Sequence, residues 1–220
     1  MKPELPAAFL TLPVTHRALH DLRHGRPENS RAAVSAAIRA GYGIEIDLQL
    51  SADGQAPVFH DYDMARLTGQ QGPIRLLSAG EAAVVNLLSG NDETIPTLVE
   101  ILSLVAGRVP LLIELKDQDG GMGPNVGELE AATAAALRGY AGSVAVMSFN
   151  PHSVAKMVEL APDIPCGLVT ESYAPEDWPL SVAACGCLRD IPDFDSSGAS
   201  FISHEVEDLD RPRVAELRAS

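Results

Sequence analysis

Basic residues are scarce in this chain. Lys and Arg together number 16 against 30 Asp and Glu, which gives a formal net charge of -14 over 220 residues. This excess of negative charge excludes broad contact with nucleic acid, whose phosphates it would repel, and electrostatic adhesion to anionic membranes. It does not exclude an anionic small molecule as substrate, because a bound cation reverses the field at a local site.

Cysteines and long apolar runs are also few. Two of the three cysteines form Cys185-Gly186-Cys187, a thiol pair on one interpretation and ordinary reduced thiols on the other, which we favour. No four-ligand zinc spacing is present. The apolar run at residues 7–10 is too short for a secretory signal, and no run approaches a membrane span. We therefore expect a reducing, cytoplasmic setting and no stable membrane association.

The chain instead contains apolar strand patterns that alternate with helix patterns. This alternation predicts parallel βα units, and polar residues follow the expected strand ends at His16, at Glu45 and Asp47, and at Glu114 and Lys116. In a (β/α)8 barrel the chemistry lies at those ends. The alternative, an open doubly wound sheet, would usually place a glycine-rich loop where this chain has His16. We therefore predict an α/β fold of the (β/α)8 TIM-barrel type.

Residues 45–61 predict a strand, a tight turn and a returning strand. Glu45 and Asp47 share one face of the first strand, opposite its apolar side chains. Two carboxylates on a strand otherwise suited to burial lose hydration unless a positive group lies between them, and a hard divalent cation prefers oxygen ligands. The returning strand would bring His60 to the same end. The alternative for this carboxylate pair is a solvated strand edge.

A series of short motifs occurs along most of the chain. In order they are His16-Arg17, Pro27-Glu28-Asn29-Ser30, Glu45-Ile46-Asp47, Ser51-Ala52-Asp53-Gly54, Val58-Phe59-His60-Asp61, Ile95-Pro96-Thr97-Leu98, Ile113-Glu114-Leu115-Lys116 and Ser148-Phe149-Asn150. Each motif alone is weak, but the ordered set resembles the glycerophosphodiester phosphodiesterase family. The resemblance implies one phosphodiesterase barrel domain over residues 1–220, with a small inserted cap at about residues 62–96.

The resemblance also implies roles for individual side chains. Glu45, Asp47 and Glu114 would hold one divalent cation, Ca²⁺ or Mg²⁺, and His16 and His60 would be the acid–base pair. The residues expected to contact the substrate are Arg17, Lys116 and Phe149. The implied activity is metal-dependent hydrolysis of glycerophosphodiesters, small molecules of lipid metabolism, to glycerol phosphate and an alcohol.

The chemistry of the residues agrees with this activity. Cleavage of a phosphodiester needs neutralisation of the phosphate charge, activation of the attacking oxygen and protonation of the departing one. Two histidines can exchange acid and base roles because their unperturbed pKa lies near neutrality. We expect the neighbouring carboxylates to hold one imidazole protonated. Which histidine is the acid, which alcohol departs and the oligomeric state are left open by the sequence.

Two departures from the family pattern bear on these expectations. Ala18 stands where the family usually has glycine, and a positive φ at that position would strain the loop. The chain also stops at Ser220, soon after the sixth expected strand, so the last two βα units are missing. We expect a partial sequence; a covering chain or a degenerate domain would also explain it. A catalytically silent phosphate-binding domain and an unrelated metal-dependent aldolase or isomerase barrel are the functional alternatives.

Overall fold

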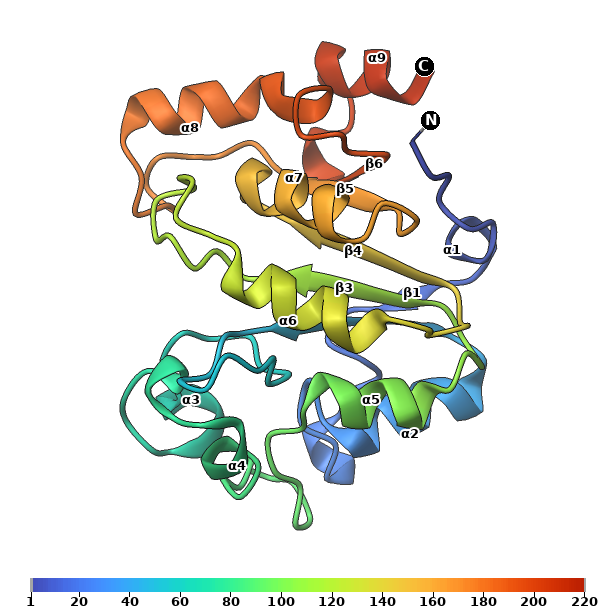
Figure 1. Ribbon diagram of the computed structural model, residues 1–220, viewed down its shortest axis with the longest axis vertical. Helices are drawn as coiled ribbons and strands as arrows, with labels where there is room; N and C mark the ends of the chain where they lie inside the picture. The colour runs from blue at the N-terminus through green and yellow to red at the C-terminus, as the bar shows by residue number, and fades with distance from the viewer. Residues whose placement is uncertain (1, 220) are drawn as a thin grey trace.

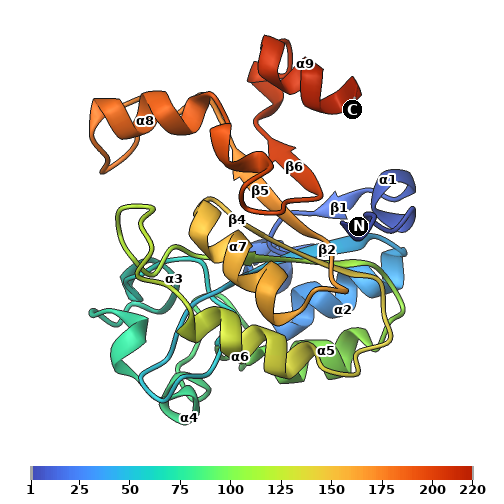
Figure 2. The same cartoon turned by 45° about the horizontal axis from the view of Figure 1, so that its top comes forward.

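The computed structural model describes residues 2–219 as an α/β fold built on a parallel sheet (Figure 1). Within these residues six strands pair in chain order, each parallel to the next. They are β1 (Val14–Thr15), β2 (Gly43–Leu48), β3 (Leu111–Leu115), β4 (Val144–Ser148), β5 (Cys166–Thr170) and β6 (Phe201–His204). The sheet curls, as Figure 2 shows. The expected parallel βα strands are confirmed, and the two further units remain a prediction.

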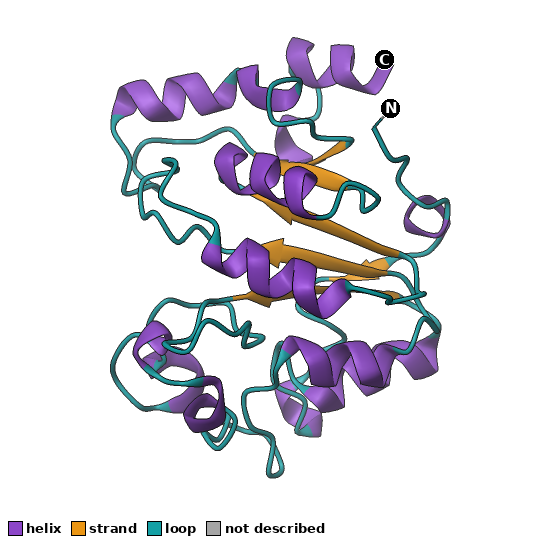
Figure 3. Cartoon of the chain, in the orientation of Figure 1, coloured by secondary structure: helices purple, strands orange, loops and turns teal. Residues whose placement is uncertain are grey.

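Helices cover the outer face of the curled sheet (Figure 3). The longer helices are α2 (Arg31–Ala40), α5 (Leu98–Val105), α6 (Glu128–Leu137), α7 (Pro151–Leu160), α8 (Val182–Arg189) and α9 (Pro212–Ala219). The short ones are α1 (Ala8–Thr11), α3 (Ala65–Thr68), α4 (Ala79–Ala82) and the 3-10 turns η1 (Leu22–His24), η2 (Ile74–Leu76), η3 (Pro192–Phe194) and η4 (Val206–Asp208). Among residues 2–219, no helix combines the length and apolarity that a membrane crossing needs.

The main hydrophobic core lies between the sheet and its outer helices. Ile44, Ile46 and Leu48 are fully buried in it, as the alternation along β2 predicts. Glu45 and Asp47 therefore point to the opposite, inner side of the curled sheet. The burial of the aliphatic side chains thus fixes the direction in which the carboxylates point.

Local signals set the helix ends near the strands. Ser30 accepts a hydrogen bond from the Ala33 N–H and caps α2, and the Asn150 side chain caps α7 with Pro151 at its first position. Thr97 closes a capping box at the start of α5. The sequence alone carries all three signals, because each depends on residues near one another in the chain.

Residues 62–96, which we call the insert, follow β2 and carry α3 and α4. The insert has an apolar cluster of its own, separate from the main core. The buried members of that cluster are Phe59, Met64, Ile74, Ala82, Val85, Leu87 and Ile95. In Figure 1 the insert lies on the same side of the molecule as the arrowhead of β3, that is, at the carboxyl ends of the strands.

The prediction of a regular returning strand after the turn is wrong. Val58 forms only an isolated antiparallel bridge with Leu48. The reason is that the segment divides its hydrogen bonds: Val58 N–H donates to the Pro96 carbonyl, while Phe59 N–H donates to the Asp47 carbonyl. The second of these bonds still brings the following residue to the end of β2.

Residues 183–190, whose sequence pattern is ambiguous between a short strand and a loop, instead lie in α8 up to Arg189, with Asp190 as the C-cap. Ser181 caps this helix by accepting a hydrogen bond from the Ala184 N–H, and Cys185 is its fully buried residue. Gly186 within the helix weakens the helical pattern in the sequence, because glycine is a poor helix former.

Candidate functional site

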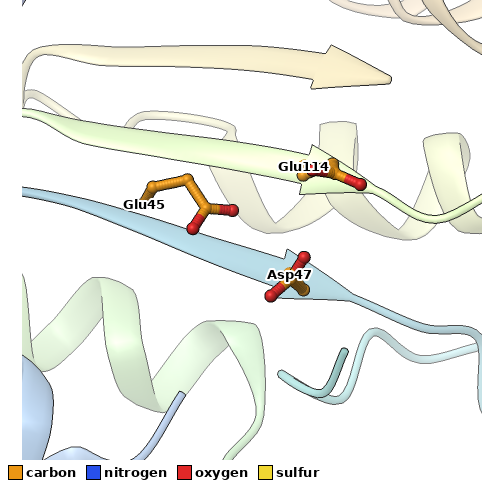
Figure 4. Close-up of side chains that lie close together, drawn as sticks. All are labelled: Glu45, Asp47 and Glu114. Atoms are coloured by element: carbon orange, nitrogen blue, oxygen red, sulfur yellow. The ribbon is translucent and has the colours of Figure 1, made fainter. Parts of the chain in front are cut away.

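Three carboxylates converge at the ends of β2 and β3 (Figure 4). The strand register pairs Asp47 with Glu114, while Glu45 precedes Asp47 on the same face of β2. Each of the three offers an oxygen within 4.8 Å of the others, and their residues are 4%, 0% and 6% exposed for Glu45, Asp47 and Glu114. Buried hard oxygen donors in this number are the type of ligand set that Ca²⁺ or Mg²⁺ takes.

The carboxylate cluster is short of positive charge. Lys116 Nζ lies 2.5 Å from Glu114 Oε1 and 2.8 Å from Asp47 Oδ1. Glu45 Oε1 is buried and has no hydrogen-bond partner among the described residues. Burial, reinforced by Asp47, raises the pKa of Glu45 well above its ordinary value, and burial also raises the pKa of Glu114. The orphaned oxygen and these shifts fit a cluster that a divalent cation completes.

Asp47 is the best-paired carboxylate of the cluster. Asn29 donates its side-chain N–H to Asp47 Oδ2 at 2.8 Å and accepts the Asp47 backbone N–H at 3.2 Å. Burial acts to raise the pKa of Asp47, but Lys116 and these contacts hold it below its ordinary value. Asn29 thus fixes one cluster member in its ionised form, a role that the sequence did not reveal.

His16 and His60 line the same cavity, of about 450 Å³, as Glu45, Glu114 and Lys116. The two imidazoles and the carboxylates therefore open onto one volume. His60 Nδ1 lies 2.7 Å from a carboxylate oxygen of Asp61. A carboxylate only accepts hydrogen bonds, so the Nδ1 atom carries the proton and Nε2 of the neutral ring is free to accept one.

The pKa values of both imidazoles are lowered, so the expectation that the carboxylates hold one ring protonated is wrong for the metal-free protein. Burial is the largest cause for each ring; Arg17 adds to it at His16, and Lys116 adds to it at His60. Asp47 acts in the opposite direction on both but does not outweigh these causes.

The turn after β1 has an unusual backbone conformation. Arg17 and Ala18 have φ values of 54° and 63°, in the left-handed region. The turn directs the Arg17 N–H to Glu45 Oε2 at 2.7 Å and the Ala18 N–H to the Glu45 carbonyl at 2.9 Å. Ala18 thus has the positive φ at which alanine is strained, at a cost of about 1–2 kcal/mol relative to glycine. The strained turn holds one oxygen of Glu45 in place.

Comparison with known proteins assigns the family. Residues 16–211 match the model of the Glycerophosphoryl diester phosphodiesterase family. The chain belongs to this family. Membership of the glycerophosphoryl diester phosphodiesterase family places the chain among the phosphoric diester hydrolases.

Individual relatives agree with the family assignment. A glycerophosphodiester phosphodiesterase of Caldanaerobacter subterraneus subsp. tengcongensis is 29% identical over 179 residues, covering 78% of this chain and 72% of that protein. A solved Oleispira antarctica phosphodiesterase in complex with the product sn-glycerol-3-phosphate is 22% identical, with a TM-score of 0.66 over 97% of this chain and 99% of that one. A solved glycerophosphodiester phosphodiesterase of Agrobacterium tumefaciens is 24% identical, with a TM-score of 0.67 over 95% and 82%. These structures show that the chain shares the fold of the family.

A second cavity, of about 470 Å³, adjoins the first. The two cavities share His60, Glu114, Lys116 and Phe149 in their walls. The wall of the second also includes Trp178, whose ring centroid lies 5.1 Å from that of Phe149. Phe149, expected from the sequence to contact the substrate, thus lies on the boundary between the two volumes.

The structure brings the residues expected for the site to one place. Seven of the eight line the first cavity, and the eighth, Asp47, lies buried beneath it. Glu28, open in the sequence between an ion pair and a helix flank, pairs with Arg17 Nη1 at 2.9 Å. Sequence reasoning missed Arg66, which comes from the insert and contacts Glu28 and Asp61. Its pattern in the sequence is that of an ordinary surface arginine.

Proposed function

We propose that this member of the glycerophosphoryl diester phosphodiesterase family hydrolyses glycerophosphodiesters to glycerol phosphate and an alcohol. The proposal includes a divalent cation and acid–base catalysis by His16 and His60. Its main support is that both imidazoles and a charge-deficient carboxylate cluster open onto one cavity. We also infer that the insert caps this site and that the chain acts as one domain in a cytoplasmic setting.

Glu45, Asp47 and Glu114 are the residues that would hold the cation. When bound, the cation supplies charge neutralisation and polarisation at the phosphate. Arg17 is positioned on the cavity wall to donate hydrogen bonds to a phosphate oxygen, and Lys116 adds a point charge next to it. Together these positive groups would favour binding of a monoanionic diester, although the net charge of the chain is strongly negative.

The two histidines would move the protons. One neutral imidazole removes the proton of the attacking oxygen, water or the neighbouring glycerol hydroxyl, as the new P–O bond forms. Where the glycerol hydroxyl attacks, the product is a cyclic phosphate, which water then opens to glycerol phosphate with the two imidazoles in exchanged roles. The other, protonated, imidazole gives its proton to the alkoxide as the P–O bond to the alcohol breaks. Because the pKa values of both rings are lowered, the base is available near pH 7. The acid gains its proton as the negative phosphate enters, since a nearby negative charge raises an imidazole pKa.

The adjoining cavity would receive the departing alcohol. It begins at His60 and Lys116, beside the proposed position of the phosphate, and continues along a wall formed by the packed rings of Phe149 and Trp178. This wall is aromatic and apolar near the site, so it suits the carbon skeleton of an alcohol better than a second phosphate.

The test is hydrolysis of a chromogenic phosphodiester and of glycerophosphodiesters, with Ca²⁺, with Mg²⁺ and with a chelator. The native chain should turn over only with a metal present. His16→Ala and His60→Ala should each lower kcat roughly a hundredfold to ten-thousandfold, the range for loss of a general acid or base. His152→Ala, which removes an exposed imidazole from α7, is the matched control and should leave kcat unchanged.

Near-full metal-dependent activity in both His16→Ala and His60→Ala would overturn the mechanism. Binding of Ca²⁺ and glycerol phosphate by calorimetry, with no hydrolysis of any diester, would instead favour the silent phosphate-binding domain. Activity that persists in the chelator would show that hydrolysis does not need the proposed cation.

A further inference from the structure

One guanidinium of the insert contacts two carboxylates at the edge of the site. Arg66 in α3 donates from Nε and Nη2 to Asp61, at 2.7 and 2.8 Å. The same group donates from Nη1 and Nη2 to Glu28, at 2.9 and 2.8 Å. Both carboxylates are therefore held by two hydrogen bonds each, a geometry that an ammonium group does not reproduce.

Each of these carboxylates in turn holds a residue of the proposed site. Asp61 Oδ1 lies 2.7 Å from His60 Nδ1, and Glu28 Oε1 accepts a hydrogen bond from Arg17 Nη1 at 2.9 Å. The Asp61 side chain is thus the only link between Arg66 and the proposed acid–base imidazole of His60 in this series of contacts. Glu28 likewise links Arg66 to the guanidinium of Arg17, which is proposed to bind phosphate.

The positive and negative charges alternate along this chain of contacts. Arg17, Glu28, Arg66 and Asp61 follow one another, and His60 ends the series. Burial acts to raise the pKa values of Glu28 and Asp61, but the hydrogen bonds from Arg66 and their other partners lower both, that of Asp61 to about 2. Both carboxylates are therefore ionised over the whole working range and bind their partners as anions.

We propose that Arg66 is a positioning residue of the phosphodiesterase site, which orients His60 through Asp61 and Arg17 through Glu28. By this arrangement the insert sets the geometry of the proton-transfer group and of the phosphate-binding group at once. The inference rests on the proposed function. A bidentate carboxylate cannot rotate away, so Asp61 keeps His60 Nδ1 as the protonated nitrogen and Nε2 facing the reaction.

A purely structural role for Arg66 makes different predictions. Its side chain is 50% exposed, and ion pairs at such positions contribute little to stability, at most about 1 kcal/mol. A structural residue of this kind would change the melting temperature slightly and leave the kinetic constants as they are. A positioning residue would change the kinetic constants even where the variant is fully folded.

The experiment compares Arg66→Gln and Arg66→Lys with the control Arg31→Gln. Arg31, the first residue of α2, also binds a carboxylate through two hydrogen bonds, both 2.9 Å to Glu100, and neither residue lines the two site cavities. We expect Arg66→Gln to lower kcat/KM by about 10–100-fold, as for residues that orient catalytic groups. Arg66→Lys should recover only a small part, because an ammonium does not bridge both carboxylates. Arg31→Gln should leave kcat and KM unchanged.

Combined substitutions show whether Arg66 acts on the kinetic constants through Asp61 and Glu28. Asp61→Asn should mainly lower kcat, since it acts on His60, whereas Glu28→Gln should mainly raise KM through Arg17. Once both carboxylates are replaced, adding Arg66→Gln should have no further effect on either constant. A full, undiminished effect of Arg66→Gln in that background would overturn the proposal.

A readout without turnover keeps this inference separate from the proposed function. Nitrogen NMR of the histidines in the metal-free protein, at a pH where His60 is neutral, should show the Nδ1–H tautomer in the native chain. The share of the Nε2–H tautomer should rise in Arg66→Gln. If that variant does not fold, Arg66→Lys serves in its place. An unchanged tautomer and unchanged kinetic constants would refute the positioning role, whereas a native chain that hydrolyses no phosphodiester refutes the function alone.

Discussion

Two groups of carboxylates border the site, and the pKa values of Glu45 and Glu114 in the first are shifted in the opposite direction to those of Glu28 and Asp61 in the second. Burial acts to raise the pKa of Asp47, the third member of the first group, but its contacts with Lys116 and Asn29 lower it. At the ends of β2 and β3, burial raises the pKa values of Glu45 and Glu114. Next to the insert, burial also acts to raise the pKa values of Glu28 and Asp61, but hydrogen bonds from Arg66 outweigh it and lower both. The side chains of Glu28 and Glu114 are similarly buried, 12% and 9% exposed. Glu28 pairs with two guanidinium groups, those of Arg17 and Arg66, whereas Glu114 pairs with the Lys116 ammonium, and this difference in cationic partners contributes to the opposite directions of the pKa shifts.

The difference shows what each group is suited to do. The carboxylates next to the insert have their cations within the chain, so they hold neighbouring side chains in fixed positions. At the strand ends, Asp47 and Glu114 share the Lys116 ammonium, and Arg17 Nε lies 3.7 Å from Asp47 Oδ2. Glu45 has no ion pair with a cationic side chain among residues 2–219, so this group remains short of positive charge. A buried charge without a full partner is costly, so the group at the strand ends is suited to take up a cation from solution.

The largest difference between the two groups is expected when one carboxylate of each is replaced. Glu45→Gln keeps the shape of the side chain and removes an anionic ligand. We expect turnover to fall about a thousandfold, since a bound metal supplies several kcal/mol and each 1.36 kcal/mol is a factor of ten. Calorimetry should show loss of Ca²⁺ binding in Glu45→Gln, whereas Glu28→Gln should still bind Ca²⁺. Equal Ca²⁺ affinity in the native chain and Glu45→Gln would show that the charge deficit serves another purpose.

The second prediction removes the cation from each group. Lys116→Met should lower the free energy of unfolding of the metal-free protein by about 3 kcal/mol, because it leaves buried carboxylates unpaired. Arg66→Met, at the more exposed pair, should cost less than about 1 kcal/mol. Urea unfolding followed by circular dichroism in a chelator measures both. Excess Ca²⁺ should restore much of the stability of Lys116→Met, because a ligand that binds only the folded state stabilises it.

The third prediction, with the smallest effect, uses the opposite signs of the pKa shifts. The folded-state pKa of Glu45 is raised above its ordinary value of 4.5, so the folded state binds more protons than the unfolded state. Its contribution to stability is present below pH 4.5 and is lost as the pH rises through the raised pKa. In a chelator, the free energy of unfolding of the native chain should therefore fall relative to Glu45→Gln as the pH rises.

Asp61 should show the reverse trend in the same pH series. Its folded-state pKa of about 2 lies below its ordinary value of 3.8, so its contribution is present above pH 3.8 and is lost as the pH falls toward 2. After allowance for solvent screening, the loss relative to Asp61→Asn should be on the order of 1 kcal/mol. Trends of the same sign at the two residues would contradict the comparison.

Much of the sheet and the carboxylate cluster was predictable because the signals are local. The alternation along β2 places Glu45 and Asp47 on one face, and Asn150 with Pro151 marks the start of α7. The departure at Ala18, where the family usually has glycine, is likewise visible at one position of one motif. Such features depend on neighbours in the sequence, and these can be read without knowing the fold.

The contacts of the insert were not predictable in this way. Arg66 and Glu28 are 38 positions apart in the chain, and their pairing depends on how the insert's apolar cluster packs. The lowered pKa values of the histidines likewise depend on burial and on Arg17 and Lys116, which only the folded arrangement brings near. The polar residues that orient a site therefore escape a pattern search that finds the residues within it.

The pairing of β2 with β3 has one further consequence. It gathers every charged group proposed for the reaction from residues 16–116. Mutually repelling carboxylates therefore come together as soon as β2 pairs with β3 during folding, and β4, β5 and β6 add no counter-charge to them. The Lys116 side chain or a cation from the surrounding solution must lie between the carboxylates from that stage onward.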